Sequence, residues 1–388
     1  MTPYDGSPDE VESRAELDTH LATGSLAGLT VQGVRLDLDP PDLTTVDLTG
    51  TTFVGCRFAS LEVAAELVRR GAHVVPIFED TPYPTHPSQL YSPEDLAAGF
   101  STGGFEAMYD TVVYRHFLAH GGVQPDIREA LTQRLHDHGI DDGLSDSMAD
   151  WATAAGPDKA IGVMGGHAVP RGSDPYRLAA ALAWRLTRAG RLVVTGGGPG
   201  VMEAANLGSY LSGRPEDELA TAIDRLAAAP DFRAHDPYTA AALAIRTAWP
   251  AAVEGEQGGW ARRGGLSIPT WLYGHEPANL FAGRIAKYFS NALREDIILR
   301  LARGGLVFAP GRAGTVQEVF QAATKTFYAT DGASGPFVFL DQRFWTDVQP
   351  IEVLLRPLLA ASPHGDLAGL VHLTDSVDEA VSILVRRS

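Results

Sequence analysis

The residues with the clearest chemical potential form a glycine-rich segment that leads to an acid. Gly311, Gly314 and Thr315 follow the apolar run 305–309, and Glu318 comes shortly after them at the start of a helical pattern. Glycine lets the backbone approach a ligand closely, and the first amides of a helix point at an anion. Because Glu318 is about one helical turn further on, we expect it to face the same crevice. The segment predicts a phosphate-binding turn with a carboxylate beside it.

A second segment repeats this design earlier in the chain. The apolar run 192–195 is followed by the glycine-rich turn 196–200 and another helical pattern. A shorter turn, 165–167, follows the apolar run 161–164. One such turn alone is as readily a packing device as a ligand site, but two together favour a phosphorylated ligand. The residues of these turns that we expect to contact it are Gly165, Gly166, His167, Gly197, Gly198, Gly200, Met202 and Glu203.

The composition excludes several classes of function. The 388 residues carry 31 basic and 48 acidic side chains, a net charge of −17, which leaves no basic surface for a nucleic acid polymer or an anionic membrane. One cysteine excludes an internal disulfide and a cysteine-rich zinc site, and no spaced histidine–carboxylate cluster predicts another metal site. No signal peptide and no membrane span are recognisable. We expect a cytoplasmic protein without a cofactor.

The second part of the chain, residues 158–388, alternates between short apolar runs and amphipathic helical patterns. This predicts a Rossmann-like α/β fold, a doubly wound parallel sheet that binds ligands at the carboxyl ends of its strands. All three turns follow a strand pattern, and the stretch 213–260 is expected to be a helical insertion or lid. The expected strands are 161–164, 192–195, 266–268, 306–309, 337–340 and 370–373, and the expected helices are 176–189, 201–211, 280–301, 315–328, 351–359 and 377–385.

The first part, residues 1–150, is expected to be an accessory αβ module. Its apolar residues recur every five positions, as in pentapeptide repeats, which form square β-coils; coincidence in a β-rich segment is the alternative. A helix start is expected at Ser92-Pro93, and polar hinges at 141–143 and 156–158. The repeated residues are Leu38, Leu43, Leu48, Phe53 and Phe58; helical patterns cover 61–70, 105–118 and 127–138, and a strand pattern covers 74–78.

The three turns together resemble the LONELY GUY family of phosphoribohydrolases, long mislabelled lysine decarboxylases. The Gly-Gly-His and Gly-Pro-Gly-x-Met-Glu-Ala wording is most similar to the larger bacterial nucleotide 5′-monophosphate nucleosidases, over about residues 158–388. The resemblance implies hydrolysis of nucleoside 5′-monophosphates to free base and ribose 5-phosphate, either broad over these nucleotides or narrower, as in cytokinin activation. It also implies Glu318 as the catalytic glutamate and Arg294 as the catalytic arginine. Glu295, Lys287 and Arg284 leave that second alignment open. It also implies a homodimer or larger assembly formed through the long helix over 280–301.

Each role has a simpler alternative. Glu318 would orient water or stabilise positive charge on the ribose, yet an acid early in a helix is also favoured by the helix dipole. The same holds for Glu203, which would bind ribose hydroxyls. Arg294 belongs to the charged run 294–296, which suits a solvated surface, and His167, a candidate contact to base or phosphate, is more often structural.

The chain departs from the family signature at two positions. Arg312 replaces the second glycine, where it would add a phosphate contact or obstruct the pocket, and Gln317 replaces the acid before Glu318. These departures favour the alternative function, a nucleotide-binding sensor or carrier of the same fold that hydrolyses nothing. An NAD-dependent enzyme is a weaker third hypothesis, because the turn 196–200 lacks the spacing of the dinucleotide fingerprint.

Overall fold

The computed structural model describes residues 9–156, 159–251 and 258–385. The chain forms two compact units, which are described separately. One contains the chain up to Leu90 together with Leu118–Ala149, and the other contains Tyr91–Phe117 and the chain from Asp150 onward. The segment 91–117, which the sequence places with the N-terminal module, therefore packs with the second unit. The expected hinge at 156–158 lies largely outside the described residues.

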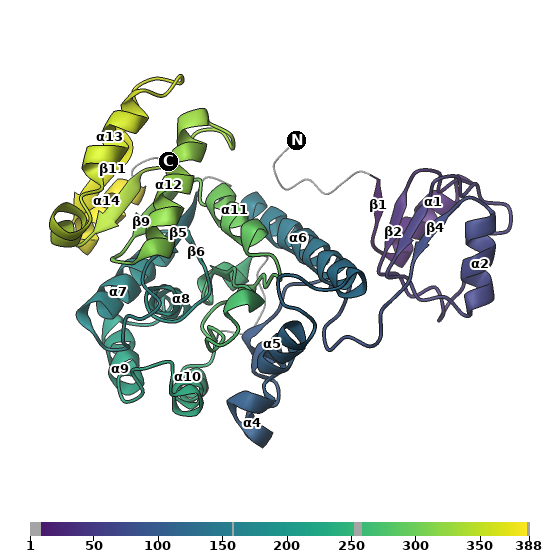
Figure 1. Ribbon diagram of the computed structural model, residues 1–388, viewed down its shortest axis with the longest axis horizontal. Coiled ribbons are helices and arrows are strands. Elements are labelled where there is room, and N and C mark those ends of the chain that lie inside the picture. Colours follow the sequence, from purple (N-terminus) through teal and green to yellow (C-terminus); the bar gives the residue numbers. More distant parts are fainter. Residues whose placement is uncertain (1–8, 157–158, 252–257, 386–388) are drawn as a thin grey trace. The chain divides into compact units, whose positions relative to one another are not determined.

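The second unit is built on a seven-stranded parallel sheet (Figure 1). Its strands are apolar and almost fully buried, as expected for strands covered on both faces. The order across the sheet is β11-β10-β9-β5-β6-β7-β8. The strands are β5 (Ala160–Met164), β6 (Leu192–Thr195), β7 (Leu266–Ser267), β8 (Arg284–Ile285), β9 (Gly305–Phe308), β10 (Phe337–Leu340) and β11 (Val371–Thr374).

Helices in two groups cover this sheet. The first group comprises α7 (Asp174–Arg188), α8 (Val201–Tyr210) and α14 (Val377–Val385), and the second comprises α11 (Asn291–Leu301), α12 (Ala313–Tyr328) and α13 (Glu352–Ala360). Their apolar sides close the hydrophobic core, in which Ile161, Leu182 and Val193 are fully buried. The Rossmann-like α/β fold expected from the sequence is confirmed.

The strand order contains one switch point. From β5 the chain moves to β6, and from β9 it moves in the opposite direction to β10, although β5 and β9 are neighbours. Ligands of doubly wound sheets bind in the crevice that such a reversal opens at the carboxyl ends of the two strands. Here the turn 165–167 follows β5 and the turn 310–312 follows β9.

The prediction of a helix over 280–301 is wrong for the first half of this range. Residues 284–285 form the edge strand β8, paired with β7, and α11 begins only at Asn291 with Ser290 as its N-cap. Leu280, Phe281 and Ile285 are buried on all sides, because the edge strand packs into the core. A continuous apolar stretch can serve a buried strand as well as a helix. The insertion expected over 213–260 is helical in its described part, where it contains α9 (Glu216–Leu226) and α10 (His235–Ala248).

The N-terminal part of the first unit is a stack of parallel strands, β1 (Glu10–Val11), β2 (Thr30–Gln32), β3 (Thr52–Val54) and β4 (His73–Val75), with α1 (Arg14–Leu21) and α2 (Leu61–Arg69) between them. Thr30 pairs with Thr52, so one coil takes 52 − 30 = 22 residues. Leu48 and Phe53 point into its core as the five-residue pattern predicts, but Leu38 is 73% exposed.

The remaining N-terminal helices are α3 (Pro93–Ala97), α4 (Phe100–Gly103), α5 (Tyr109–Ala119) and α6 (Ile127–Ala155). Ser92 caps α3 in a capping box, as predicted. The hinge expected at 141–143 is wrong, because α6 runs through it. Gly143 and Asp142 instead contact distant parts of the chain. A Cβ on Gly143 would lie 3.3 Å from the backbone of Gln89, and Asp142 accepts a hydrogen bond from Gln32. In the described parts of the chain, no helix is both long and apolar enough to cross a membrane.

Candidate functional site

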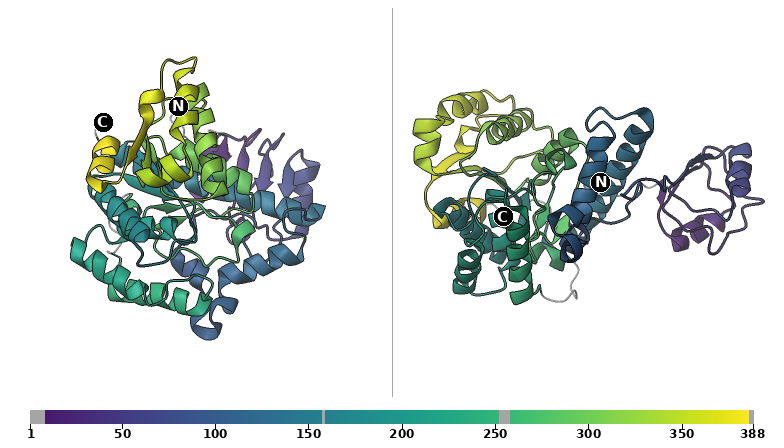
Figure 2. Two further views of the ribbon diagram at one scale, coloured as in Figure 1. Left: turned by 60° about the vertical axis from the view of Figure 1, so that its left-hand side comes forward. Right: turned by 60° about the horizontal axis from the view of Figure 1, so that its bottom comes forward.

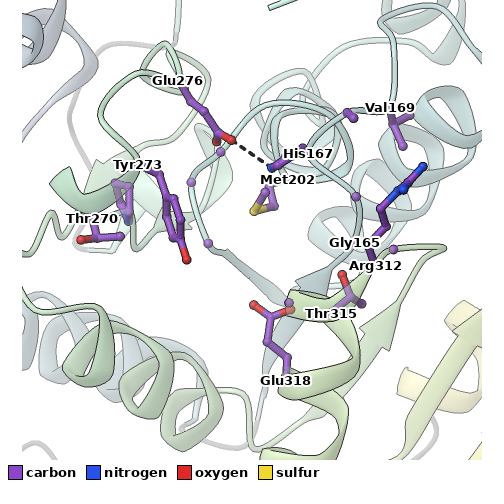
Figure 3. Close-up of a pocket in the computed structure, with 18 of the residues that line it drawn as sticks. Gly165, His167, Val169, Met202, Thr270, Tyr273, Glu276, Arg312, Thr315 and Glu318 are labelled. Carbon is purple, nitrogen blue, oxygen red and sulfur yellow. Dashed lines mark ion pairs between the residues drawn. The ribbon is translucent and has the colours of Figure 1, made fainter.

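A cavity of about 850 Å³ opens at the switch point of the sheet, within the second unit (Figure 3). The turns after β5, β6 and β9 all contribute to its wall, together with the loop that follows β7. Figure 2 shows the second unit from two further directions. All of the predicted site residues line this cavity except Gly200 and Glu203. The sequence motifs therefore converge on one place, as their positions after parallel strands require.

The turn 310–315 leaves the start of α12 open to the cavity. Arg312 is the N-cap of this helix, and no side chain caps it. The Val316 amide donates to the Arg312 carbonyl, but the amides of Gly314 and Thr315 precede the first intrahelical hydrogen bonds. A Cβ on Gly311 would lie 2.1 Å from Thr315 Oγ1, so the turn closes this tightly only with glycine. Within the described residues neither amide has an acceptor, so both can donate to an anion at the positive end of the helix dipole.

Glu318 presents its carboxylate to the same cavity from α12 (Figure 3). The side chain is only 16% exposed, and its Oε1 lies 3.9 Å from Arg294 Nη1. Burial raises the pKa of Glu318 to about 7, which Arg294 opposes and the negative charge of Glu295 reinforces. The carboxyl thus exchanges its proton near neutral pH, where a general acid or base is most effective.

Arg294 is held from behind by the protein backbone. Its Nε donates to the Ile268 carbonyl at 3.2 Å, and the side chain is 10% exposed. Nη1 is 3.9 Å from Glu318 and 4.0 Å from Glu295, so the guanidinium stands between two carboxylates. The arrangement is that of a site group, because a solvated surface cluster would not be buried in this way.

Glu295 is a site residue for which sequence reasoning gave no role. It lines the cavity, and its Oε2 accepts a hydrogen bond of 2.9 Å from Gln317 Nε2. The Glu295 carboxylate therefore lies directly beside Gln317, the residue that the sequence analysis identified as a missing acid. Its position next to Arg294 was the available signal, but adjacent helical residues rarely share a face.

The turn 196–200 resembles the turn 310–315 in sequence but differs from it in structure. The Val201 amide, at the start of α8, donates to the Gly166 carbonyl at 3.2 Å and is therefore not available to a ligand. Gly200 has φ +70°, and a Cβ there would lie 2.4 Å from the Gly166 oxygen. This glycine serves close packing between two turns. Gly197, Gly198 and Met202 remain in the cavity wall.

Glu203 does not reach the cavity, contrary to the role in ribose binding expected for it. It is 1% exposed and accepts hydrogen bonds from Arg171 Nε at 2.9 Å, Tyr176 at 3.0 Å and Tyr238 at 2.6 Å. Arg171 is itself buried, and its guanidinium lies over the Tyr238 ring. The four side chains form a closed ionic and hydrogen-bonded cluster, so Glu203 anchors α8 to its neighbours.

Two further pairs of ionisable side chains contribute to the cavity wall. His167 Nδ1 lies 2.9 Å from Glu276 Oε1, and Figure 3 shows this pair on the side away from Glu318. Burial raises the pKa of Glu276 and lowers that of His167. Lys287 is buried and held by Asp110, with Nζ 2.5 Å from Oδ1. Asp110 and Glu276 had no local sequence signal, since both come from segments outside the recognised motifs.

Comparison with known proteins gives little beyond this geometry. No protein-family model and no curated protein matches the chain. Among solved structures, it is similar to the X-ray structure of TM1055, a target of the Northeast Structural Genomics Consortium, with 21% sequence identity and a TM-score of 0.35. The match covers 59% of this chain and 99% of that chain. The assignment of the site therefore depends on its own residues.

Proposed function

We propose that this protein hydrolyses the N-glycosidic bond of nucleoside 5′-monophosphates and releases the free base and ribose 5-phosphate. One observation carries the proposal: an open helix N-terminus and a buried carboxylate with a pKa of about 7 lie one turn apart on α12 and face one cavity. The first part binds a phosphate, and the second reacts close to it. The resemblance of the turns to the LONELY GUY family points to the same activity.

The phosphate would be held by the N-terminus of α12. The amides of Gly314 and Thr315 and the Thr315 hydroxyl offer hydrogen bonds, and the Arg312 side chain lines the same part of the wall (Figure 3). The cavity, at about 850 Å³, is within the size range of small-molecule and cofactor sites. A nucleotide anchored by its phosphate at this end places its ribose near Glu318.

Glu318 would act as the base for the attacking water. The bond from the ribose C1′ to the base nitrogen breaks, its electron pair leaves with the base, and the sugar becomes oxocarbenium-like. Water adds to C1′ and gives a proton to ionised Glu318, while the departing base takes up a proton from solvent. Arg294, 3.9 Å away, orients the carboxylate, and the negative charge of Glu295 favours the cationic sugar.

Nucleotide binding without hydrolysis is the second candidate. Arg312 favours it, because this side chain occupies the position of the second signature glycine and lines the cavity. Gln317 no longer favours it, since Glu295 provides a carboxylate at that place.

The test is a product analysis. The purified protein is incubated with AMP, GMP, IMP, CMP, UMP and dTMP, and free bases and ribose 5-phosphate or its 2-deoxy form are separated by chromatography. We expect base release that Glu318→Gln reduces by roughly 10²–10⁴-fold. Glu216→Gln, which changes an exposed acid on α9, serves as the matched control with unchanged release. Intact nucleotides at high protein concentration, with measurable binding, would replace the enzyme by the binding protein.

A further inference from the structure

The wall of the cavity opposite Glu318 carries a second carboxylate, and Arg233 adds a positive charge near His167. Glu276 follows the short helix η4 (Trp271–Tyr273), and Figure 3 shows it on the far side of the cavity from Glu318. Its side chain is 10% exposed, and Oε1 is paired with His167 Nδ1 at 2.9 Å. The two acids therefore face different parts of any ligand that fills the space between them.

Glu276 also determines which end of a nucleotide lies beside it. A Cβ on Gly198 would be only 3.1 Å from Glu276 Oε2, so this oxygen lies against the glycine-rich turn 196–200. A carboxylate here repels an anion, whereas the turn 310–315 offers the amides of Gly314 and Thr315 and the side chain of Arg312. We therefore expect the phosphate to bind at the turn 310–315. The base then extends toward Glu276.

The chemistry of Glu276 Oε2 indicates what it would recognise. Among the residues that the structure describes, no side chain or backbone group donates a hydrogen bond to this oxygen, while His167 occupies the other one. An ionised carboxylate only accepts hydrogen bonds. Glu276 lines the cavity and Oε2 is not sealed from it, so a ligand N–H can reach this acceptor and form a hydrogen bond with it. Tyr273 and Met202 line the space between the two acids, as a flat base requires.

We infer that Glu276 selects nucleotides whose base carries an exocyclic amino group, through a hydrogen bond from that group to Oε2. The inference depends on the proposed function for the orientation of the nucleotide in the cavity. It adds a specificity-determining residue that lies outside the glycine-rich turns.

The experiment compares nucleotides that differ by one amino group. AMP is paired with purine riboside 5′-monophosphate, and GMP with IMP, and kcat/KM is measured for each. A hydrogen bond to a charged acceptor predicts a roughly 10–10²-fold preference for the amino member of at least one pair. Glu276→Leu removes the acceptor, so the ratio of kcat/KM values within each pair should fall close to one. Glu276→Gln keeps one acceptor and gives an intermediate ratio, and it covers the case in which the leucine variant is unstable. Glu216→Gln retains the wild-type ratio.

Binding measurements separate this inference from the proposed function. The same nucleotide pairs are titrated calorimetrically into Glu318→Gln protein with and without Glu276→Leu. Hydrolysis with a preference that Glu276→Leu leaves unchanged would overturn the inference and keep the enzyme. Amino-selective binding that disappears in Glu276→Leu, without any hydrolysis by the unmodified protein, would keep the inference and overturn the enzyme. Failure of every nucleotide to bind would overturn both.

Discussion

The two glycine-rich turns of this protein have the same sequence design and different structures. Each follows a buried strand and leads to a helix with an acid near its start. At the first turn, the Val201 amide is bonded to Gly166, and Glu203 is enclosed by Arg171 and two tyrosines. At the second, the helix start is uncapped and Glu318 faces the cavity. A motif of this kind identifies a sharp strand-to-helix turn; whether it binds a ligand depends on what occupies its amides.

The strongest test of this difference exchanges each acid for its amide. Glu318→Gln should lower kcat by roughly 10²–10⁴-fold and leave a folded protein, because it removes only the base. Glu203→Gln should lower the free energy of unfolding by about 3–5 kcal/mol, since it leaves the buried Arg171 without a counter-ion. Steady-state kinetics and urea denaturation measure the two effects. The comparison fails if Glu203→Gln loses activity with unchanged stability.

The pH dependence of stability provides a second test. The folded protein raises the pKa of Glu318 from 4.5 to about 7, so between these values it retains a proton that the unfolded chain releases. The carboxyl therefore opposes folding increasingly as pH rises from 4.5 to 7, and fully above pH 7. Glu318→Gln should stabilise the protein by up to about 3 kcal/mol at pH 8 and by almost nothing at pH 4.5. Denaturation curves at the two pH values measure this; an equal effect at both would contradict the raised pKa.

A smaller effect is expected from alanine at one glycine of each turn. Gly200→Ala should destabilise the protein by roughly 1–3 kcal/mol, because φ is +70° and the new Cβ would meet the Gly166 oxygen. Gly314→Ala has open space around its Cβ, so it should leave stability within about 1 kcal/mol of wild type and raise KM about tenfold by crowding the phosphate. Thermal unfolding and KM determine both. Equal changes in stability and in KM for the two variants would show that the two turns have the same role.

Local sequence patterns were sufficient for most of the second unit. The strand 337–340 and the helix 377–385 have the bounds that their patterns predict, because a short buried run and an amphipathic period are local properties. The edge strand β8 was mistaken for helix because its burial comes from distant parts of the chain. The prediction of a hinge at 141–143 was wrong for a related reason. Gly143 lies within α6, and its lack of a side chain allows close packing against the backbone of Gln89, which the local sequence does not show.

The site shows the same limit. Sequence spacing brought Glu318, Thr315 and His167 to the carboxyl edge of the sheet correctly, since strand ends define that edge. It could not distinguish Glu203 from Glu318, because the partner that encloses Glu203 is Arg171, which is 203 − 171 = 32 positions away. Nor could it find Glu276, which depends on how the loop after β7 folds over the first turn.

The most direct measurement is a crystal structure of the protein with ribose 5-phosphate, the proposed product, at a resolution that shows the phosphate. We expect the phosphate at the N-terminus of α12, within hydrogen-bond distance of the Gly314 and Thr315 amides, with the ribose toward Glu318. A phosphate bound instead at Gly198–Gly200, before α8, would contradict the assignment of the two turns.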